Sequence, residues 1–185
     1  MIDRLQHIDN NWTLFLDRDG VINHQKEGSY IFTWDEFIFF EGVLQAIQSL
    51  SSQFRYIFIV TNQRGVGKGL MTEKELQQIH HNMQKSVELA GGRIDGIYYC
   101  TELDGHCRKP APGMALQAQK DFPGIDFNRS VMVGNSMSDM EFGRNIGATT
   151  IFVTTTNPAV DRADSRIDAV YKSLEDFAGA LQSLR

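Results

Sequence analysis

Short apolar runs alternate with amphipathic stretches along this chain. Each run is about as long as a buried strand, and each stretch has its apolar residues at helical spacing. The strand candidates are residues 12–16, 56–60, 96–100, 130–133 and 149–154. The helix candidates are residues 43–50, 73–90, 114–120, 139–145 and 174–184. Strands that alternate with helices form parallel βαβ units, so the sequence predicts an α/β fold, a doubly wound parallel sheet in a three-layer α/β/α arrangement.

The helix candidate at 73–90 has terminal signals on both sides. Thr72 precedes it as an N-cap, and Glu75, three residues later, completes a capping box. Gly91 and Gly92 follow as stop signals. No internal repeat or Pro/Gly/Ser-rich linker interrupts the chain, so we expect a single domain over residues 1–185.

The bulk composition excludes several kinds of protein. With 42% hydrophobic and 22% charged residues, the chain suits a globular domain with a proper core. Its apolar runs are far shorter than the roughly 20 residues that cross a membrane, and residues 1–4 lack the layout of a signal peptide. A net charge of -5 opposes non-specific nucleic-acid binding but admits a small anionic substrate. We expect a monomer with no nucleic-acid or membrane partner.

Two acids follow the first strand candidate. Asp17 and Asp19 come directly after residues 12–16, and Gly20 then lets the chain turn away, so both carboxylates can face one pocket. One carboxylate could attack a substrate while the other transfers protons. The simpler alternative is that the two acids form an N-cap and a turn after the strand.

Polar groups also follow three other strand candidates. The segments are residues 61–63 (Thr-Asn-Gln), 108–110 (Arg-Lys-Pro) and 134–139 (Gly-Asn-Ser-Met-Ser-Asp). An open parallel sheet binds its ligands at the carboxyl ends of its strands. We therefore expect these segments to meet the two acids at one edge of the sheet.

Phosphoryl transfer suits this set of groups. A carboxylate that attacks a phosphate monoester faces like-charge repulsion, so it requires cations and hydrogen-bond donors around the phosphoryl oxygens. We expect Asp17 to be both nucleophile and metal ligand, and Lys109 to neutralise charge. The Thr61 hydroxyl and the Asn62 backbone N–H would donate to the transferred group, while Asp19 would protonate the leaving alkoxide and then activate water. Hard oxygen ligands favour Mg²⁺.

The four segments, in this order and over nearly the whole chain, resemble the four motifs of the haloacid dehalogenase (HAD) superfamily phosphatases. Three stretches are similar to the branch that holds histidinol-phosphate phosphatase and D-glycero-D-manno-heptose-1,7-bisphosphate phosphatase. They are Asp-Arg-Asp-Gly-Val-Ile-Asn at 17–23, Thr-Asn-Gln-Arg-Gly-Val-Gly-Lys-Gly at 61–69 and Cys-Arg-Lys-Pro-Ala-Pro-Gly-Met at 107–114. The resemblance implies a HAD-like core and a Mg²⁺-dependent phosphomonoesterase that forms an aspartyl-phosphate.

The resemblance also implies a role for each matched residue. Four residues would handle the phosphoryl group: the nucleophile Asp17, the general acid and base Asp19, and the phosphate binders Thr61 and Lys109. Arg108 and Gln63 would contact the substrate. Arg64, which follows Gln63 at the site entrance, is either a contact for a second phosphate or a solvent-facing charge.

The metal site departs from the family pattern at Asn135, where the family usually has an acid. The resemblance implies that Asp17 and the backbone carbonyl of Asp19 bind the metal. The amide oxygen of Asn135 can also bind Mg²⁺, but the site then has one negative charge fewer. Asp139 would compensate, either as a direct ligand or through a bound water. We therefore expect a weaker metal affinity than an acid at position 135 would give.

The spacing of the motifs leaves no room for a cap domain. Thr61 lies 44 residues after Asp17, and Lys109 lies 48 residues after Thr61. Substrate selection then depends on three loops, residues 22–39, 64–71 and 101–107. The first loop is rich in aromatic residues, which either form a β-flap over the site or simply pack on the core.

The chain has two cysteines, seven residues apart at Cys100 and Cys107. Two cysteines provide no disulfide framework, and a reducing cytoplasm is the simplest location. The related branch often carries a structural zinc with four Cys or His ligands. Here Cys100, His106 and Cys107 supply only three candidates, so we expect no structural zinc.

Two further features favour ordinary structural roles. Residues 65–69 (Gly-Val-Gly-Lys-Gly) lack the first glycine and the final Ser or Thr of a P-loop, so we expect a mobile entrance loop rather than an ATP site. His80 and His81 lie in the middle of a predicted helix, where we expect a solvated face. His24 is close enough to the predicted site to be a possible substrate contact.

Three classes of function stay open. The first, which we favour, is a phosphatase of sugar metabolism acting on the 7-phosphate of a heptose 1,7-bisphosphate, with histidinol phosphate as the alternative substrate. The second is a phospho-accepting receiver module, although receivers accept phosphate on a middle strand and lack an acid placed as Asp19 is. The third is a binding domain without catalysis, which Asn135 allows but the intact Asp17 and Lys109 oppose.

Overall fold

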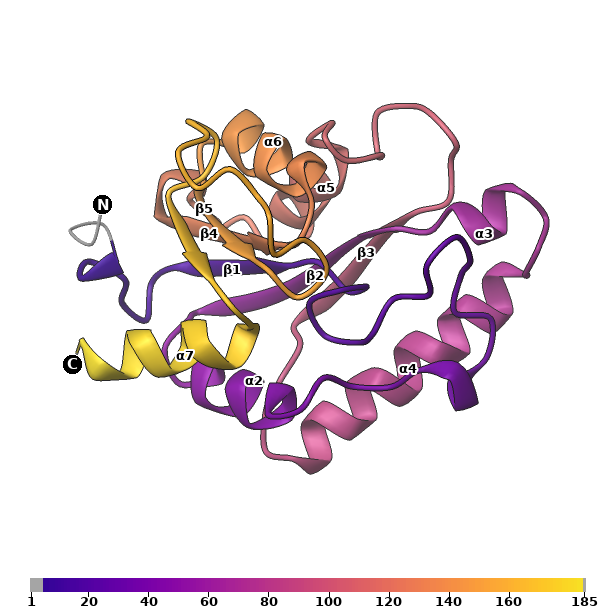
Figure 1. Ribbon diagram of the computed structural model, residues 1–185, viewed down its shortest axis with the longest axis horizontal. Coiled ribbons are helices and arrows are strands. Elements are labelled where there is room, and N and C mark those ends of the chain that lie inside the picture. Colours follow the sequence, from indigo (N-terminus) through magenta and orange to yellow (C-terminus); the bar gives the residue numbers. More distant parts are fainter. Residues whose placement is uncertain (1–4, 185) are drawn as a thin grey trace.

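The chain forms a six-stranded, fully parallel sheet in a computed structural model that describes residues 5–184 (Figure 1). The strands are β1 (Thr13–Leu16), β2 (Tyr56–Asn62), β3 (Gly96–Cys100), β4 (Ser130–Gly134), β5 (Thr149–Val153) and β6 (Ala169–Tyr171). Their order across the sheet is β3-β2-β1-β4-β5-β6. This is a doubly wound order that reverses direction between β1 and β4, so a crevice opens at the carboxyl ends of these two strands. Residues 1–4, in which we find no signal-peptide layout, lie outside the described residues.

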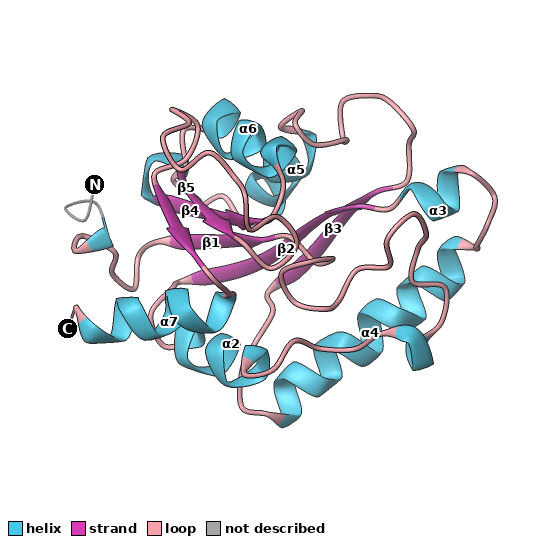
Figure 2. Cartoon of the chain, viewed as in Figure 1, coloured by secondary structure: helices cyan, strands magenta, loops and turns pink. Residues whose placement is uncertain are grey.

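Helices cover both faces of the sheet (Figure 2). One face carries α2 (Val43–Ser51), α4 (Glu73–Leu89) and α7 (Leu174–Ser183), and the other carries α5 (Gly113–Asp121) and α6 (Met137–Ile146). Successive side chains of β1 point to opposite faces of the sheet and pack into two separate hydrophobic clusters. Leu14 and Leu16 belong to one cluster, and Phe15 belongs to the other. Burial on both faces explains the continuous apolar runs in the sequence. The predicted three-layer α/β/α fold is confirmed.

All ten predicted elements are present, with ends that differ by at most two residues. The capping box of α4 is confirmed, since the Thr72 hydroxyl accepts from the Glu75 backbone N–H and the Glu75 carboxylate accepts from the Thr72 N–H. Four short elements are absent from the prediction: β6, α3 and the 3₁₀ turns at Trp34–Glu36 and Phe127–Arg129. The edge strand β6 has only three residues, all half-buried, and α3 (Arg64–Gly67) is a single helical turn where we expected a loop.

The loop at 22–39 is not a β-flap. It contains a 3₁₀ turn at Trp34–Glu36 and one isolated bridge between Asn23 and Phe39. Its aromatic residues mostly pack on the core: the Phe37 ring is buried and lies 5.1 Å from Trp34 and 5.0 Å from Phe39, between ring centroids. Burying these rings stabilises the fold more than a short exposed hairpin would, because an isolated two-stranded hairpin is only marginally stable in water. Of the two alternatives, packing of the aromatic residues on the core is therefore the right one.

The intervals between the catalytic-type motifs are filled by elements of the core itself. Within the described residues, α2 occupies the interval from β1 to β2, and α3 and α4 occupy the interval from β2 to β3. No cap domain is inserted in either interval. None of the helices in residues 5–184 is long and apolar enough to cross a membrane.

Candidate active site

A cleft lies at the carboxyl ends of β1, β2 and β4, where the doubly wound sheet changes direction. It consists of two adjoining cavities of about 180 and 170 Å³ that share Asp19, Gln25 and Asn62. The inner cavity is also lined by Asp17, Thr61, Lys109, Asn135, Ser136, Ser138 and Asp139. The outer cavity is also lined by Arg18, Lys26, Ser29, Tyr30, Ile31 and Gln63. The four predicted strand-end segments therefore meet, as the sequence predicts.

A buried lysine sits between two carboxylates on the floor of the inner cavity. Lys109 Nζ lies 2.8 Å from Asp17 Oδ1 and 2.7 Å from Asp139 Oδ1, and it donates to the Val60 carbonyl at 2.7 Å. Burial alone would lower the pKa of Lys109, but the Asp139 and Asp17 charges outweigh it and hold the pKa above its usual value. Lys109 is therefore a fixed cation.

Asp17 has too little positive charge around it. Burial raises its pKa to about 7, which the nearby Lys109 ammonium only partly offsets, and the Asp139 carboxylate raises it further. One ammonium shared by two carboxylates leaves the floor of the site negative. A dianionic phosphoryl group would be repelled there unless a further cation joined the site.

Asp19 is held by three donors. Arg18 Nη2 lies 2.9 Å from both carboxylate oxygens, Asn23 Nδ2 donates to one oxygen at 2.9 Å, and Gln63 Nε2 donates to the other at 2.9 Å. Burial would raise the pKa of Asp19, but the Arg18 charge and these hydrogen bonds hold it below the usual value. The carboxylate has a single fixed orientation.

The end of β2 contributes one hydroxyl and two amides. Gln63 Nε2 also donates to Thr61 Oγ1 at 2.8 Å, which leaves the buried Thr61 hydroxyl proton free to point at a ligand. The Asn62 side chain exchanges hydrogen bonds with the backbone of Lys109, at 3.0 and 3.1 Å. Asn62 thus ties β2 to the lysine loop, and Gln63 braces Asp19 and Thr61.

Three oxygens converge with no hydrogen-bond donor between them: Asp17 Oδ2, the Asp19 carbonyl oxygen and Asn135 Oδ1. Asn135 Oδ1 faces Asp17 Oδ2 at 3.3 Å and the Asp19 carbonyl oxygen at 3.1 Å, while its Nδ2 donates to Thr156 Oγ1 at 2.8 Å. Flipping the amide would replace these oxygen contacts with hydrogen bonds, but a bound cation explains the present orientation equally well. Adjacent oxygens around Mg²⁺ are about 3 Å apart, given metal–oxygen distances of about 2.1 Å. The residues present therefore fit a magnesium ion.

Gly20 allows this convergence. Its φ is +88°, which favours glycine, and a Cβ built there would lie 2.2 Å from the Asn135 amide nitrogen. A side chain at position 20 would therefore push Asn135 away from Asp17.

Asp139 turns away from the three convergent oxygens. Its Oδ2 accepts from the Ser136 N–H at 3.0 Å and from the Ser136 hydroxyl at 2.6 Å, so it caps α6. Its Oδ1 pairs with Lys109. In this arrangement Asp139 contacts the lysine, and any contact with a metal would run through water.

Two arginines predicted to contact the substrate, Arg108 and Arg64, line neither cavity, although Arg108 is close enough to Tyr30 of the outer cavity for their charges to interact. Arg108 is half-buried, and its Nη1 is buried without a hydrogen-bond partner among the described residues. Burial, followed by the charge of Arg64, lowers the pKa of Arg108, so the two guanidinium groups are close enough to repel each other. Neither arginine forms an ion pair in the described part of the chain. The Asp104 charge acts on Arg108 in the opposite direction, but no ion pair within residues 5–184 neutralises either arginine, so the two are candidates for binding an anion.

The prediction of a solvated face is right for His81 and wrong for His80. His81 is exposed, but His80 is only 4% exposed and contacts Arg18. His80 lies on the buried stripe of α4 with Leu76 and Met83, which a search for polar strand ends does not consider. His24 packs against Phe40, with ring centroids 4.0 Å apart and the rings tilted by 39°, and lines neither cavity.

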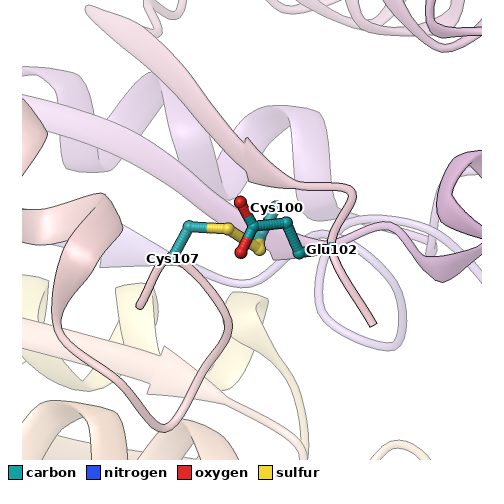
Figure 3. A group of neighbouring side chains, drawn as sticks. All are labelled: Cys100, Glu102 and Cys107. Carbon is teal, nitrogen blue, oxygen red and sulfur yellow. A yellow bond between two sulfur atoms is a disulfide. The ribbon is translucent and has the colours of Figure 1, made fainter. Parts of the chain in front are cut away.

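The two cysteines are joined by a disulfide (Figure 3). Cys100 ends β3 and Cys107 closes the following loop, which brings their Cα atoms to 5.4 Å. The Glu102 carboxylate lies beside the bond. The expectation that two cysteines form no disulfide framework is wrong in this respect, because a short loop brings both ends together. In the bonded form neither sulfur is the thiolate that zinc binds.

The fold and the site define a hydrolase of the HAD type. Residues 106–177 match a family model described as HAD-hydrolase-like. The chain is 36% identical over 179 residues to D-glycero-alpha-D-manno-heptose-1,7-bisphosphate 7-phosphatase of Mycobacterium bovis, covering 95% of this chain and 94% of the relative. It is 35% identical over 182 residues to D-glycero-beta-D-manno-heptose-1,7-bisphosphate 7-phosphatase of Pasteurella multocida, covering 93% and 97%.

A solved structure agrees with these relatives. The D,D-heptose 1,7-bisphosphate phosphatase of B. bronchiseptica, complexed with magnesium and phosphate, superimposes with a TM-score of 0.82 at 26% identity, covering 94% of this chain and 99% of that one. The chain belongs to the HAD phosphatases, in the same family as these relatives. It is a phosphoric monoester hydrolase.

Proposed function

We propose that this phosphatase removes the 7-phosphate of D-glycero-D-manno-heptose 1,7-bisphosphate through an aspartyl-phosphate on Asp17. One observation carries the chemistry: Asp17 and the fixed Lys109 cation lie 2.8 Å apart in the cleft that also holds Asp19. The relatives named as heptose-bisphosphate 7-phosphatases support the substrate.

The phosphoryl group binds in the inner cavity. Lys109 and the Thr61 hydroxyl contact its oxygens, and the Asn62 backbone N–H donates to it. These groups hold phosphorus in line with the Asp17 carboxylate, so that attack forms the acyl phosphate and breaks the bond to the sugar oxygen. The charge that develops on the phosphoryl oxygens faces fixed donors and a buried ammonium.

Asp19 transfers the protons. It gives a proton to the departing sugar oxygen and later takes one from the water that hydrolyses the acyl phosphate. Although its pKa is low in the free site, an arriving phosphate dianion raises the pKa of a neighbouring carboxyl group. Substrate binding therefore favours the protonated form that the first step requires.

A Mg²⁺ ion completes the site. We propose that Asp17 Oδ2, the Asp19 carbonyl and Asn135 Oδ1 hold it, with Asp139 acting through water. When bound, the ion supplies Lewis-acid charge that offsets the repulsion between carboxylate and phosphate. This assignment is supported by the oxygen contacts of 3.1 and 3.3 Å and by the raised pKa of Asp17.

The two arginines near Tyr30 of the outer cavity favour a substrate with two phosphates. The unpaired guanidinium groups of Arg108 and Arg64 suit the second phosphate of a sugar bisphosphate. Histidinol phosphate carries a cationic amine in place of that phosphate, which these arginines would repel. Gln63 contributes indirectly, because its side chain braces Asp19 and Thr61 at the edge of the outer cavity.

Phosphate release tests the proposal. Purified protein with Mg²⁺ is assayed against the α and β anomers of the heptose bisphosphate, histidinol phosphate and simple sugar monophosphates, with Asp17→Asn as the inactive control. We expect the highest kcat/KM for one of the bisphosphates. Preference for histidinol phosphate would overturn the substrate, and an active Asp17→Asn variant would overturn the chemistry.

We also propose that the chain works as a single-domain cytoplasmic monomer on small molecules, without nucleic-acid or membrane partners. The single sheet that spans the described residues supports one domain, and the net charge of -5 opposes a nucleic-acid partner. A cytoplasmic location implies that Cys100 and Cys107 are thiols there, because disulfides are rare in a reducing compartment. Light scattering on the purified protein measures the mass in solution, and a value twice that of the chain would contradict it.

A further inference from the structure

Arg18 is a buried cation that the phosphoryl site does not use directly. Its side chain is 1% exposed, although arginine is rarely buried unless it is paired. One end of its guanidinium group holds Asp19, with Nη2 at 2.9 Å from both carboxylate oxygens. The other end reaches His80, with Nη1 at 2.9 Å from Nε2. Arg18 therefore connects helix α4 to Asp19.

The chemistry of this contact fixes the state of His80. A guanidinium group only donates, so His80 Nε2 must accept, and the imidazole is neutral with its proton on Nδ1. Burial, with a smaller effect of the Arg18 charge, lowers the pKa of His80 to about 3, in agreement with that state. His80 is thus a permanent acceptor, not an acid or a base.

The surroundings hold both side chains in place. The His80 ring packs against Tyr99, with centroids 5.3 Å apart, and the Arg18 guanidinium carbon lies 5.9 Å from the centre of the Phe37 ring. His80 is also fixed by the rigid backbone of α4. A displacement of His80 would therefore be transmitted to Arg18, and from Arg18 to the Asp19 carboxylate.

We propose that Arg18 and His80 are positioning residues for the phosphatase reaction: His80 holds Arg18, and Arg18 holds the Asp19 carboxyl group toward the leaving oxygen of the substrate. This inference rests on the proposed function, because it takes Asp19 as the group that moves the proton. His80 lines neither cavity, and Arg18, which lines only the outer one, acts on the reaction through the Asp19 carboxylate.

The leaving group separates this role from a merely structural one. Departure of a sugar alkoxide needs a proton from Asp19, whereas p-nitrophenolate is stable enough to leave without one. The constant kcat/KM reports the steps up to departure of the leaving group. A misplaced Asp19 should therefore lower kcat/KM for the sugar phosphate far more than for p-nitrophenyl phosphate. General damage to the site would lower both equally.

The test compares His80→Leu, which removes the acceptor, with His80→Gln, which keeps one. His81→Leu is the matched control, because it makes the same change at an exposed position of the same helix. We expect His80→Leu to lower kcat/KM for the heptose bisphosphate at least tenfold and for p-nitrophenyl phosphate less than threefold. His80→Gln should recover most of the loss, and His81→Leu should match the wild type.

Equal losses on the two substrates, or a fully active His80→Leu variant, would overturn the inference. Thermal melting checks that each variant is folded. If His80→Leu does not fold, the two substrates are compared in Arg18→Lys, which keeps the positive charge but loses the planar guanidinium group that contacts both Asp19 and His80. An active Asp17→Asn variant would overturn the proposed function itself. An inactive Asp17→Asn together with a fully active His80→Leu would overturn only the positioning role.

Discussion

Lys109 Nζ lies 2.8 Å from Asp17 Oδ1 although 92 residues separate them along the chain, and both side chains are almost fully buried. The same ammonium contacts Asp139. This one cation therefore controls the charge at the nucleophile and at the base of the phosphoryl cavity.

Substituting Lys109 by Met should abolish most of the activity. The variant loses the cation that faces the phosphoryl oxygens, so we expect kcat to fall by about 10³-fold. It also leaves two buried carboxylates without their partner, which should cost about 3–5 kcal/mol of stability. Phosphate release and urea unfolding measure the two effects. Lys120→Met, at an exposed lysine, serves as the control and should change neither.

Substituting Asn135 by Asp should tighten magnesium binding. The carboxylate adds one negative charge to the three convergent oxygens, so we expect Mg²⁺ to bind about tenfold more tightly, or on the order of 1.4 kcal/mol. Calorimetric titration of the free protein measures the affinity without any need for turnover. An unchanged affinity would mean that Asn135 does not contact the metal.

Substituting Arg108 by Met should weaken bisphosphate recognition. Loss of a charge-assisted contact with the second phosphate should cost about 1.5–3 kcal/mol in kcat/KM. A sugar monophosphate provides the internal control, because it lacks the group that Arg108 binds. Losses of the same size on both substrates would contradict a role in binding the second phosphate.

Stability should depend on pH through His80. Its pKa is about 3 in the folded protein and 6.5 as the ordinary value, so the unfolded chain binds the extra proton first. The contribution of neutral His80 to the free energy of unfolding is therefore fully present above pH 6.5, and it decreases as the pH falls below 6.5. Between pH 7 and pH 4.5 the wild type should lose roughly 2–3 kcal/mol more than His80→Gln.

Urea unfolding at the two pH values measures this difference. His81→Gln is the matched control, and its loss between the two pH values should equal that of the wild type because His81 is exposed. Equal losses in the wild type and His80→Gln would show that His80 is not held neutral in the folded state.

The phosphoryl site could be predicted from the sequence because one topological rule brings its parts together. Asp17 and Asn135 directly follow β1 and β4, Thr61 is the second-to-last residue of β2, and the ends of parallel strands meet at one edge of the sheet. The rule requires only that the strands are parallel and where each one ends, and apolar runs that alternate with helices indicate both. It does not require knowledge of any long-range side-chain contact.

The support around the site could not be predicted in this way. His80 reaches Arg18 across 62 residues through the buried side of a helix, and no local pattern marks that contact. The hydrogen bonds that turn Gln63 toward Asp19 depend likewise on tertiary packing. The aromatic loop and the disulfide show the same limit, because burial and chain closure decide them.

The most direct test of the account is the site of phosphorylation during turnover. In Asp19→Asn, hydrolysis of the intermediate should be slow, whereas p-nitrophenyl phosphate can still transfer its phosphoryl group because p-nitrophenolate leaves without a proton. Acid quenching with p-nitrophenyl phosphate and Mg²⁺ should therefore trap the enzyme in its phosphorylated form. Mass spectrometry of the peptides should find the phosphoryl group on Asp17. A phosphoryl group on another residue, or turnover by the wild type with no phosphorylated enzyme at any time after mixing, would contradict the account.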